Sequence, residues 1–250
     1  MKIALFGGTF DPVHRGHLAV ARTAADEFGL SLVYFAPADI PPHKQKRRLT
    51  DFQHRFAMLA LATAEDKRFV PSLLDSYTGQ PNYSIDSVRR LKKTLKKSDK
   101  LYFLIGMDAF KDISTWRMPE ELLAECEFII ANRPGYSLAD AAKALPRNLQ
   151  PSDGYLRSLR TERGFQNSGS LALPGATLHL LKDVHERVSS TQIRAAAAKS
   201  ARQLARYVPP LVAEYIRKEH LYHPVGRSSE ATPGVKMLSF HETPSGAVKQ

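Results

Sequence analysis

One short segment of this chain has residue types and spacing suited to binding phosphate. Residues 7–17 read Gly-Gly-Thr-Phe-Asp-Pro-Val-His-Arg-Gly-His. Gly7 and Gly8 let backbone amides approach a phosphate closely, and Thr9 adds a hydroxyl donor. His14 and His17 stand three residues apart, so both imidazoles would project to one side of a first helical turn. We therefore expect this segment to stabilise charge on a nucleotide phosphate.

The residues around this segment predict a turn between a strand and a helix. Residues 3–6 are apolar and have the length of a buried parallel strand, and residues 18–28 show a helical pattern closed by Gly29. The carboxyl end of a strand is where open α/β sheets bind ligands, and a helix N-terminus adds free N–H groups that favour anions. Two alternatives stay open: a glycine-rich turn with two surface histidines, or a metal bound by the histidine pair without a nearby carboxylate.

Residues 188–194, Val-Ser-Ser-Thr-Gln-Ile-Arg, form a second candidate anion site. Ser189, Ser190 and Thr191 at a helix start offer hydroxyl and backbone donors to phosphate oxygens. Arg194 follows one turn later and could make a charge-assisted contact on the same side. A helix cap followed by a surface arginine is the alternative.

Four further residues follow predicted strands or open a predicted helix. Lys44, after Pro-Pro-His, could reach a phosphate as a point charge, and Asp108 could accept a hydrogen bond from a ribose hydroxyl. Trp116, the only tryptophan, could stack on an aromatic ring. Ser84 is expected to cap a helix whose free amides could also hold a carboxylate. A solvated lysine, a core indole and an ordinary cap are the structural alternatives.

The composition describes a globular protein with an excess of basic residues. Of its residues 43% are hydrophobic and 24% charged, and the net charge is +11. The basic residues gather in 44–48 and 89–100 without an RNA-binding signature, which favours polyanionic substrates over nucleic acid as partners. The single cysteine, Cys126, excludes an intrachain disulfide and is expected in the core. Because no signal peptide or membrane-spanning stretch is apparent, we expect a cytoplasmic protein with no membrane partner.

Apolar strand patterns alternate with helical patterns along the chain. This alternation predicts an α/β fold, a Rossmann-like parallel sheet with helices on both faces. The expected strands are residues 2–6, 31–36, 69–72, 101–105, 127–131 and 177–181. The expected helices are residues 17–28, 51–64, 85–97, 119–125, 191–199 and 210–220.

The same pattern suggests one domain over residues 1–223. It breaks between residues 134 and 175, where only 137–145 look helical, so we interpret 136–176 as an insertion or long loop. Residues 224–250 contain Gly, Ser, Thr, Pro and Lys with little apolar content, which predicts a disordered tail.

Several motifs, in order, resemble those of the bacterial nicotinate-nucleotide adenylyltransferases, members of the His-x-Gly-His nucleotidyltransferase superfamily. The resemblance extends over most of residues 1–223 and implies a nucleotidyltransferase-type Rossmann-like fold. Its motifs are residues 7–17, Pro-Pro-His-Lys at 41–44, Tyr-Ser-Ile-Asp-Ser at 83–87, Gly-x-Asp at 106–108 with Trp116, Ala-Asn-Arg-Pro-Gly at 131–135, and Ser-Ser-Thr-x-Ile-Arg at 189–194.

The resemblance implies transfer of AMP from ATP to nicotinate mononucleotide, with Mg²⁺ arriving on ATP and no metal held by protein side chains. It also leaves a homo-oligomer open. The expected site residues fall into three groups: His14, His17, Lys44 and Arg194 for catalysis; Gly7, Gly8, Thr9, Phe10, Ser189, Ser190 and Thr191 for ATP and its phosphates; Lys44, Ser84, Asp108 and Trp116 for nicotinate mononucleotide.

Two other functions fit the same motifs. One is adenylyl transfer to phosphopantetheine or another small phosphate, and the other is a non-catalytic regulator that binds nucleotides. Pyrophosphate release would separate an enzyme from a regulator, and the choice of acceptor would separate the two enzymes.

Overall fold

The structure, a computed structural model, describes residues 1–42, 49–76, 79–132, 136–161, 169–181, 188–197 and 201–222. Within these residues seven strands form one sheet in the order β3-β2-β1-β4-β5-β7-β6, parallel except for the β6–β7 pair. The strands are β1 (Lys2–Gly8), β2 (Leu32–Pro37), β3 (Phe69–Pro71), β4 (Lys100–Gly106), β5 (Glu127–Ala131), β6 (Gly169–Leu173) and β7 (Ala176–Leu181).

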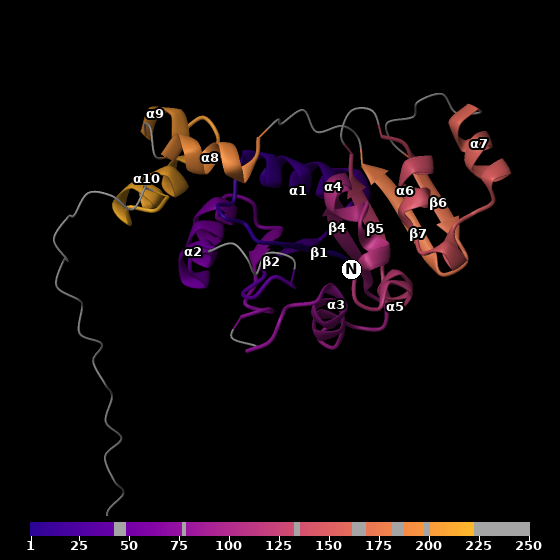
Figure 1. Cartoon of the computed structure of the whole chain (residues 1–250). Coiled ribbons are helices and arrows are strands. Elements are labelled where there is room, and N and C mark those ends of the chain that lie inside the picture. Colours follow the sequence, from indigo (N-terminus) through magenta and orange to yellow (C-terminus); the bar gives the residue numbers. More distant parts are fainter. Residues whose placement is uncertain are drawn as a thin grey trace, which may run out of the picture.

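Helices cover both faces of this sheet, and Figure 1 shows α1 above the central strands with α3 and α5 below them. Alternate residues of β1 enter opposite cores: Ile3 and Leu5 pack with α3 and α5, whereas Ala4 and Phe6 pack with α1 and α2. The helices are α1 (Arg15–Phe28), α2 (Phe52–Thr63), α3 (Ser84–Lys92), α4 (Met107–Phe110), α5 (Pro119–Glu125), α6 (Leu138–Ala144), α7 (Asp153–Thr161), α8 (Ser190–Ala197), α9 (Ala201–Leu204) and α10 (Pro210–Lys218), with 3₁₀ turns η2 (Ile113–Thr115) and η3 (Arg147–Leu149).

The predicted α/β sheet with two helical layers is confirmed. Its strands also end together: Gly8 pairs with Pro37 on β2, and Gly106 pairs with Ala131 on β5. The loops that follow these strands therefore meet at one edge of the sheet. Every candidate segment that the structure describes near residues 7–17, 41–42, 106–116 and 188–194 follows a strand or opens a helix at this edge.

Residues 136–176 contain more regular structure than the sequence suggested. We expected an insertion or long loop with one helix; the structure has α6, η3, α7 and strand β6 there. β6 pairs antiparallel with β7 at the edge of the sheet, and only Leu171 of its five residues is buried. An edge strand with one buried side chain gives too weak an alternation to detect from the sequence.

The prediction that Ser84 caps helix α3 is wrong: Tyr83 is the N-cap residue, and Ser84 is the first residue of the helix. Helix α3 ends at Lys92, five residues before the predicted end of the basic helix at residue 97. Past its end the chain tightens into a turn in which the Thr94 amide and hydroxyl both donate to the Leu91 carbonyl, at 2.9 and 2.7 Å. A threonine hydroxyl that donates to a backbone carbonyl competes with the helical hydrogen bonds, and the surrounding lysines repel one another. Both effects favour an early end of the helix.

Two further expectations concern the single cysteine and membrane-spanning segments. Cys126 lies in the core, as predicted, and burial raises the pKa of its thiol to about 12, which makes it a poor nucleophile. None of the helices within the described ranges is long and apolar enough to span a membrane.

The last described residues contact the core and the segment 7–17. Leu221 packs against the core on the α1 face. The Tyr222 hydroxyl donates to Oδ1 of buried Asp11 at 2.8 Å, and burial raises the pKa of this phenol. The predicted tail, residues 224–250, lies outside the described residues.

Deleting residues 225–250 is expected to leave the melting temperature and the turnover almost unchanged, because this segment lacks the apolar periodicity needed to dock on a core. Deleting 221–250 as a matched control removes Leu221 and Tyr222 as well. It should lower the melting temperature by roughly 5 °C or more, since buried apolar surface and a hydrogen bond to a buried carboxylate are lost. A large effect of the shorter deletion would show that the tail contributes to the fold or to an oligomer.

Candidate active site

The two histidines of the first motif cap helix α1 and also bond to each other's backbone. His14 is the N-cap residue, and its Nδ1 accepts from the His17 amide at 3.3 Å. In return, the His14 amide donates to Nδ1 of His17 at 3.2 Å. The two rings stack with their centroids 3.6 Å apart. The reciprocal cap satisfies two of the free amides at the start of the helix and fixes both side chains.

This arrangement decides which ring nitrogen carries the proton. Because each Nδ1 accepts a backbone N–H, we assign the proton of each neutral imidazole to Nε2, at the far end of the ring. Burial also lowers the pKa of His14 to about 4. Both rings therefore present an Nε2–H donor, and His14 stays neutral near pH 7.

The second predicted helix start lies beside the first. Ser189 bonds to Gln192 through both its backbone and its hydroxyl, and Ser190 of α8 donates to the Pro12 carbonyl at 3.4 Å. Arg194 donates to the Asp11 carbonyl at 2.6 Å and to the Thr191 hydroxyl at 3.0 Å. These bonds attach α8 to the turn before α1, so the two motifs form one unit.

Both helix starts border one cleft, which we call the histidine cleft. It measures about 430 Å³, within the range of small-ligand sites. The candidate residues Gly7, His14, His17, Asp108, Ser189 and Ser190 line it. Buried Asn132 at the end of β5 also lines it and donates to the Tyr136 carbonyl at 3.2 Å.

A smaller cleft of about 150 Å³ lies on the other side of Gly7, and we call it the tryptophan cleft. Half-buried Trp116 lines it, with its ring edge-on to Phe103 at 6.4 Å. The candidates Gly7, Gly8, Thr9, Ser84 and Trp116 all border this space. Its size suits a single aromatic ring, and it shares Gly7 and no other lining residue with the histidine cleft.

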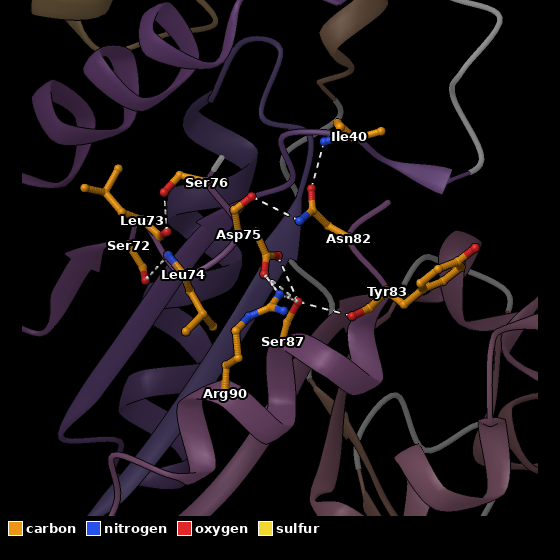
Figure 2. A network of polar contacts seen from close by, with 10 residues as sticks. All are labelled: Ile40, Ser72, Leu73, Leu74, Asp75, Ser76, Asn82, Tyr83, Ser87 and Arg90. Atoms are coloured by element: carbon orange, nitrogen blue, oxygen red, sulfur yellow. Dashed lines mark hydrogen bonds and ion pairs between the residues drawn. The ribbon is translucent and has the colours of Figure 1, made fainter. Parts of the chain in front are cut away.

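A network of polar contacts builds one wall of the tryptophan cleft (Figure 2). The Asn82 amide donates to the Asp75 carbonyl at 3.0 Å, and its oxygen accepts from the Ile40 amide at 2.7 Å. The Asp75 carboxylate accepts from the Ser87 hydroxyl at 2.7 Å and forms an ion pair with Arg90 at 2.5 Å. This network joins the loops after β2 and β3 to the start of α3.

The Asp75 carboxylate is the single acidic group among the described residues of this cleft. Burial raises its pKa, while the bonds from Ser87 and Arg90 act in the opposite direction. The charge of Asp75 is thus compensated from the side of α3 rather than by a ligand.

Sequence reasoning missed Arg55, which holds the turn after β1 in place. Its side chain is 1% exposed and donates to the carbonyls of Thr9 and Ala38 at 2.8 Å each and of Thr50 at 2.8 Å. Burial lowers its pKa, and the nearby carboxylate of Asp11 opposes that shift. The sequence held one signal: Arg55 shares the buried stripe of α2 with Phe52, Met58, Leu59 and Ala62.

The structure does not bring every candidate together. Lys44 lies outside the described residues. The Phe10 ring is buried, 5.0 Å from the His17 ring between centroids, and lines neither cleft. Asp108 lies in the histidine cleft, not with Ser84 and Trp116, so its contact with the acceptor stays a prediction. Arg194 and Thr191 bond to each other next to the histidine cleft without lining it.

The donor set of the histidine cleft suits anions better than cations. Imidazole N–H groups, serine hydroxyls and backbone amides all donate hydrogen bonds. Across the described part of the chain, no three His, Cys, Asp or Glu residues converge where a metal ion could bind.

Comparison with known proteins decides the family. The Cytidylyltransferase-like family model matches residues 5–196. The chain is 38% identical over 223 residues to the probable nicotinate-nucleotide adenylyltransferase of Desulfotalea psychrophila, covering 88% of this chain and 99% of that protein. The chain belongs to the nicotinate-nucleotide adenylyltransferase family. The corresponding protein of Solibacter usitatus is 35% identical over 223 residues, covering 89% and 100% of the two chains.

Solved structures share the fold of this nicotinate-nucleotide adenylyltransferase family member. Plasmodium falciparum nicotinic acid mononucleotide adenylyltransferase, complexed with NaAD, aligns with a TM-score of 0.62 at 21% identity over 88% of this chain and 97% of that one. A putative nicotinate-nucleotide adenylyltransferase from Vibrio parahaemolyticus aligns with a TM-score of 0.55 at 18% identity, over 88% and 94%. The resemblance inferred from the motifs is confirmed.

The lowered pKa of His14 makes stability depend on pH. In the folded state the group titrates near 4, and in the unfolded state near 6.5. The unfolded chain therefore binds more protons as pH falls below about 6.5, so this stabilisation is lost between pH 6.5 and 4. Between pH 7 and 5, we expect urea unfolding to show a loss from this group on the order of 2 kcal/mol.

The control for this prediction is His14→Asn, which can still accept the His17 amide as an N-cap but does not titrate. Its free energy of unfolding should fall less between pH 7 and 5 than that of the wild type. Equal slopes in the two proteins would mean that His14 is not held neutral by the fold.

Proposed function

We propose that this protein transfers AMP from ATP to nicotinate mononucleotide, forming nicotinate adenine dinucleotide and releasing pyrophosphate. The observation that carries the proposal is the pair of histidines that cap α1 and line a nucleotide-sized cleft, which adjoins a ring-sized cleft at Gly7. The names of the relatives support the same reaction.

This reaction needs charge stabilisation and alignment more than acid–base chemistry. A phosphate oxygen of the acceptor attacks the α-phosphorus of ATP, a new P–O bond forms, and the bond to the β-phosphate breaks with pyrophosphate as the leaving group. The attacking phosphate is mostly dianionic at neutral pH, so no general base is required. The protein must hold two anions in line and neutralise the charge that builds on the α-phosphate and the leaving group.

We place ATP in the histidine cleft. His14 and His17 would donate from Nε2 to the α-phosphate, and the amides at the starts of α1 and α8 would meet the other phosphate oxygens. Neutral donors suit this task, because they need no proton transfer and are fixed before the substrate arrives. Lys44 and Arg194 are proposed to add positive charge, and Asp108 to meet a ribose hydroxyl.

We place the pyridine ring of the acceptor in the tryptophan cleft, against Trp116. Gly7 lines both clefts, so the acceptor phosphate would approach the α-phosphate at this residue. Mg²⁺ belongs to this proposal as a companion of ATP, held by its phosphates and neutralising part of their charge. We also propose a cytoplasmic location, no nucleic-acid or membrane partner, and a homo-oligomer.

An acceptor panel with ATP tests the proposal through pyrophosphate release. We expect kcat/KM to be roughly tenfold or more higher for nicotinate mononucleotide than for nicotinamide mononucleotide. The NH₂ group of the amide would face hydrogen-bond donors of the site, and that pairing would stay unmade. Trp116→Ala should weaken both acceptors through lost stacking. Ser84→Ala should reduce the difference in kcat/KM between the two acceptors only if the Ser84 hydroxyl contacts the ring substituent directly.

The panel also contains the rivals of this proposal. Activity with phosphopantetheine alone would assign the protein to another adenylyl transfer. Nucleotide binding without any pyrophosphate release would make it a regulator.

His17→Ala is expected to lower kcat by roughly 10²–10³, the range for loss of one preorganised donor, with smaller changes in KM. His54→Ala is the matched control, since His54 bonds to Tyr215 on α10 and lines neither cleft. If His17→Ala instead raised KM for ATP and kept kcat near normal, the histidine would bind only the ground state.

A further inference from the structure

We infer that the guanidinium of Arg117 selects the acceptor by its charge: it attracts the pyridine carboxylate of nicotinate mononucleotide and thereby discriminates against the neutral amide. This inference rests on the proposed function and names the group behind its acceptor preference. Arg117 directly follows Trp116, and both residues line the tryptophan cleft.

Arg117 is held at the cleft by the ring of Tyr83. Its guanidinium carbon lies 4.7 Å from the centroid of that ring, a cation–π contact. Tyr83 is the N-cap residue of α3, directly before Ser84, and it lines the same cleft. The cation therefore lies beside the wall of the cleft that Ser84 lines, while the Arg117 side chain remains exposed to solvent.

The backbone around Arg117 fixes where its side chain starts. The Trp116 amide closes turn η2 by donating to the Ile113 carbonyl at 3.1 Å, and the Met118 carbonyl accepts the Leu122 amide at the start of α5. Met118 itself has φ +51°, in the left-handed region. Trp116 and Arg117 thus lie in a short segment tied at both ends, which keeps the indole and the guanidinium at one cleft.

The charges of the cleft leave Arg117 available to an anion. Among the described lining residues it is the single cation, and none of the described carboxylates forms an ion pair with it. The one acid of the cleft, Asp75, is already bound by Ser87 and Arg90 (Figure 2). A carboxylate that enters the cleft would therefore meet one positive group whose charge no acid of this wall balances.

The chemistry of guanidinium explains why the two acceptors would differ. A guanidinium is always charged and offers parallel N–H donors that match the two oxygens of a carboxylate. A carboxamide has one oxygen, no charge, and an NH₂ group that turns a donor toward those donors. The ribose and phosphate of the two acceptors are identical, so an effect of Arg117 on the ring substituent should appear in the ratio of the two substrates.

The experiment compares kcat/KM for nicotinate and nicotinamide mononucleotide in wild type, Arg117→Gln and Arg117→Lys. Glutamine keeps a polar side chain but removes the charge, so the ratio should fall about tenfold, through a higher KM for nicotinate mononucleotide at unchanged kcat and unchanged KM for ATP. Lysine keeps the charge without the planar fork and should retain part of the ratio. Lys93→Gln, an exposed change of the same charge at the far end of α3, should leave the ratio unchanged.

The outcomes separate this inference from the proposed function. If wild type releases no pyrophosphate with ATP and either acceptor, the proposed function fails. If wild type prefers nicotinate mononucleotide and Arg117→Gln keeps the same ratio, the inference alone is wrong and backbone amides make the choice. The inference would also be wrong if Arg117→Gln raised KM equally for both acceptors or lowered kcat. It would be wrong as well if Lys93→Gln lowered the ratio as much as Arg117→Gln does.

Discussion

The reciprocal hydrogen bonds between His14 and His17 are the constraint on which the rest of the site depends. In both rings Nδ1 accepts a hydrogen bond from the backbone at the start of α1, so each neutral ring carries its proton on Nε2. One contact pair thus caps a helix, sets two tautomers and aims two donors. The cost is sensitivity to acid, because a proton on Nδ1 of His14 would oppose the amide that it now accepts.

Distant parts of the chain keep this turn in place. Arg55 on α2 binds the Thr9 carbonyl, Arg194 on α8 binds the Asp11 carbonyl, and Tyr222 binds the Asp11 carboxylate. A turn with free amides has few contacts of its own, so its geometry must come from neighbouring elements. These three side chains supply that support without lining either cleft.

The sequence allowed prediction of the parts of the site that are local in the chain. The strand-turn-helix around residues 7–17 and the hydroxyl-rich start of α8 were predictable because spacing and capping chemistry act over a few residues. The contacts of Arg55 with Thr9, of Asp75 with Arg90 and of Tyr222 with Asp11 were not, since these pairs lie 46, 15 and 211 positions apart. Edge strand β6 was not predicted for another reason: it buries a single side chain and so shows no alternation of apolar and polar residues.

The bond between Tyr222 and Asp11 also orders events during synthesis. Its two residues are 211 positions apart, and at about 5–20 residues per second the ribosome takes roughly 10–40 s to make the chain between them. During that time the turn at residues 7–14 cannot form its contact with Tyr222, the phenol that satisfies Oδ1 of Asp11 in the complete chain. A chain interrupted between residues 195 and 221 would carry every motif of the site and still lack the contact of Tyr222 with Asp11. Completion of the folded domain, rather than appearance of the motifs, marks the point at which the site is finished.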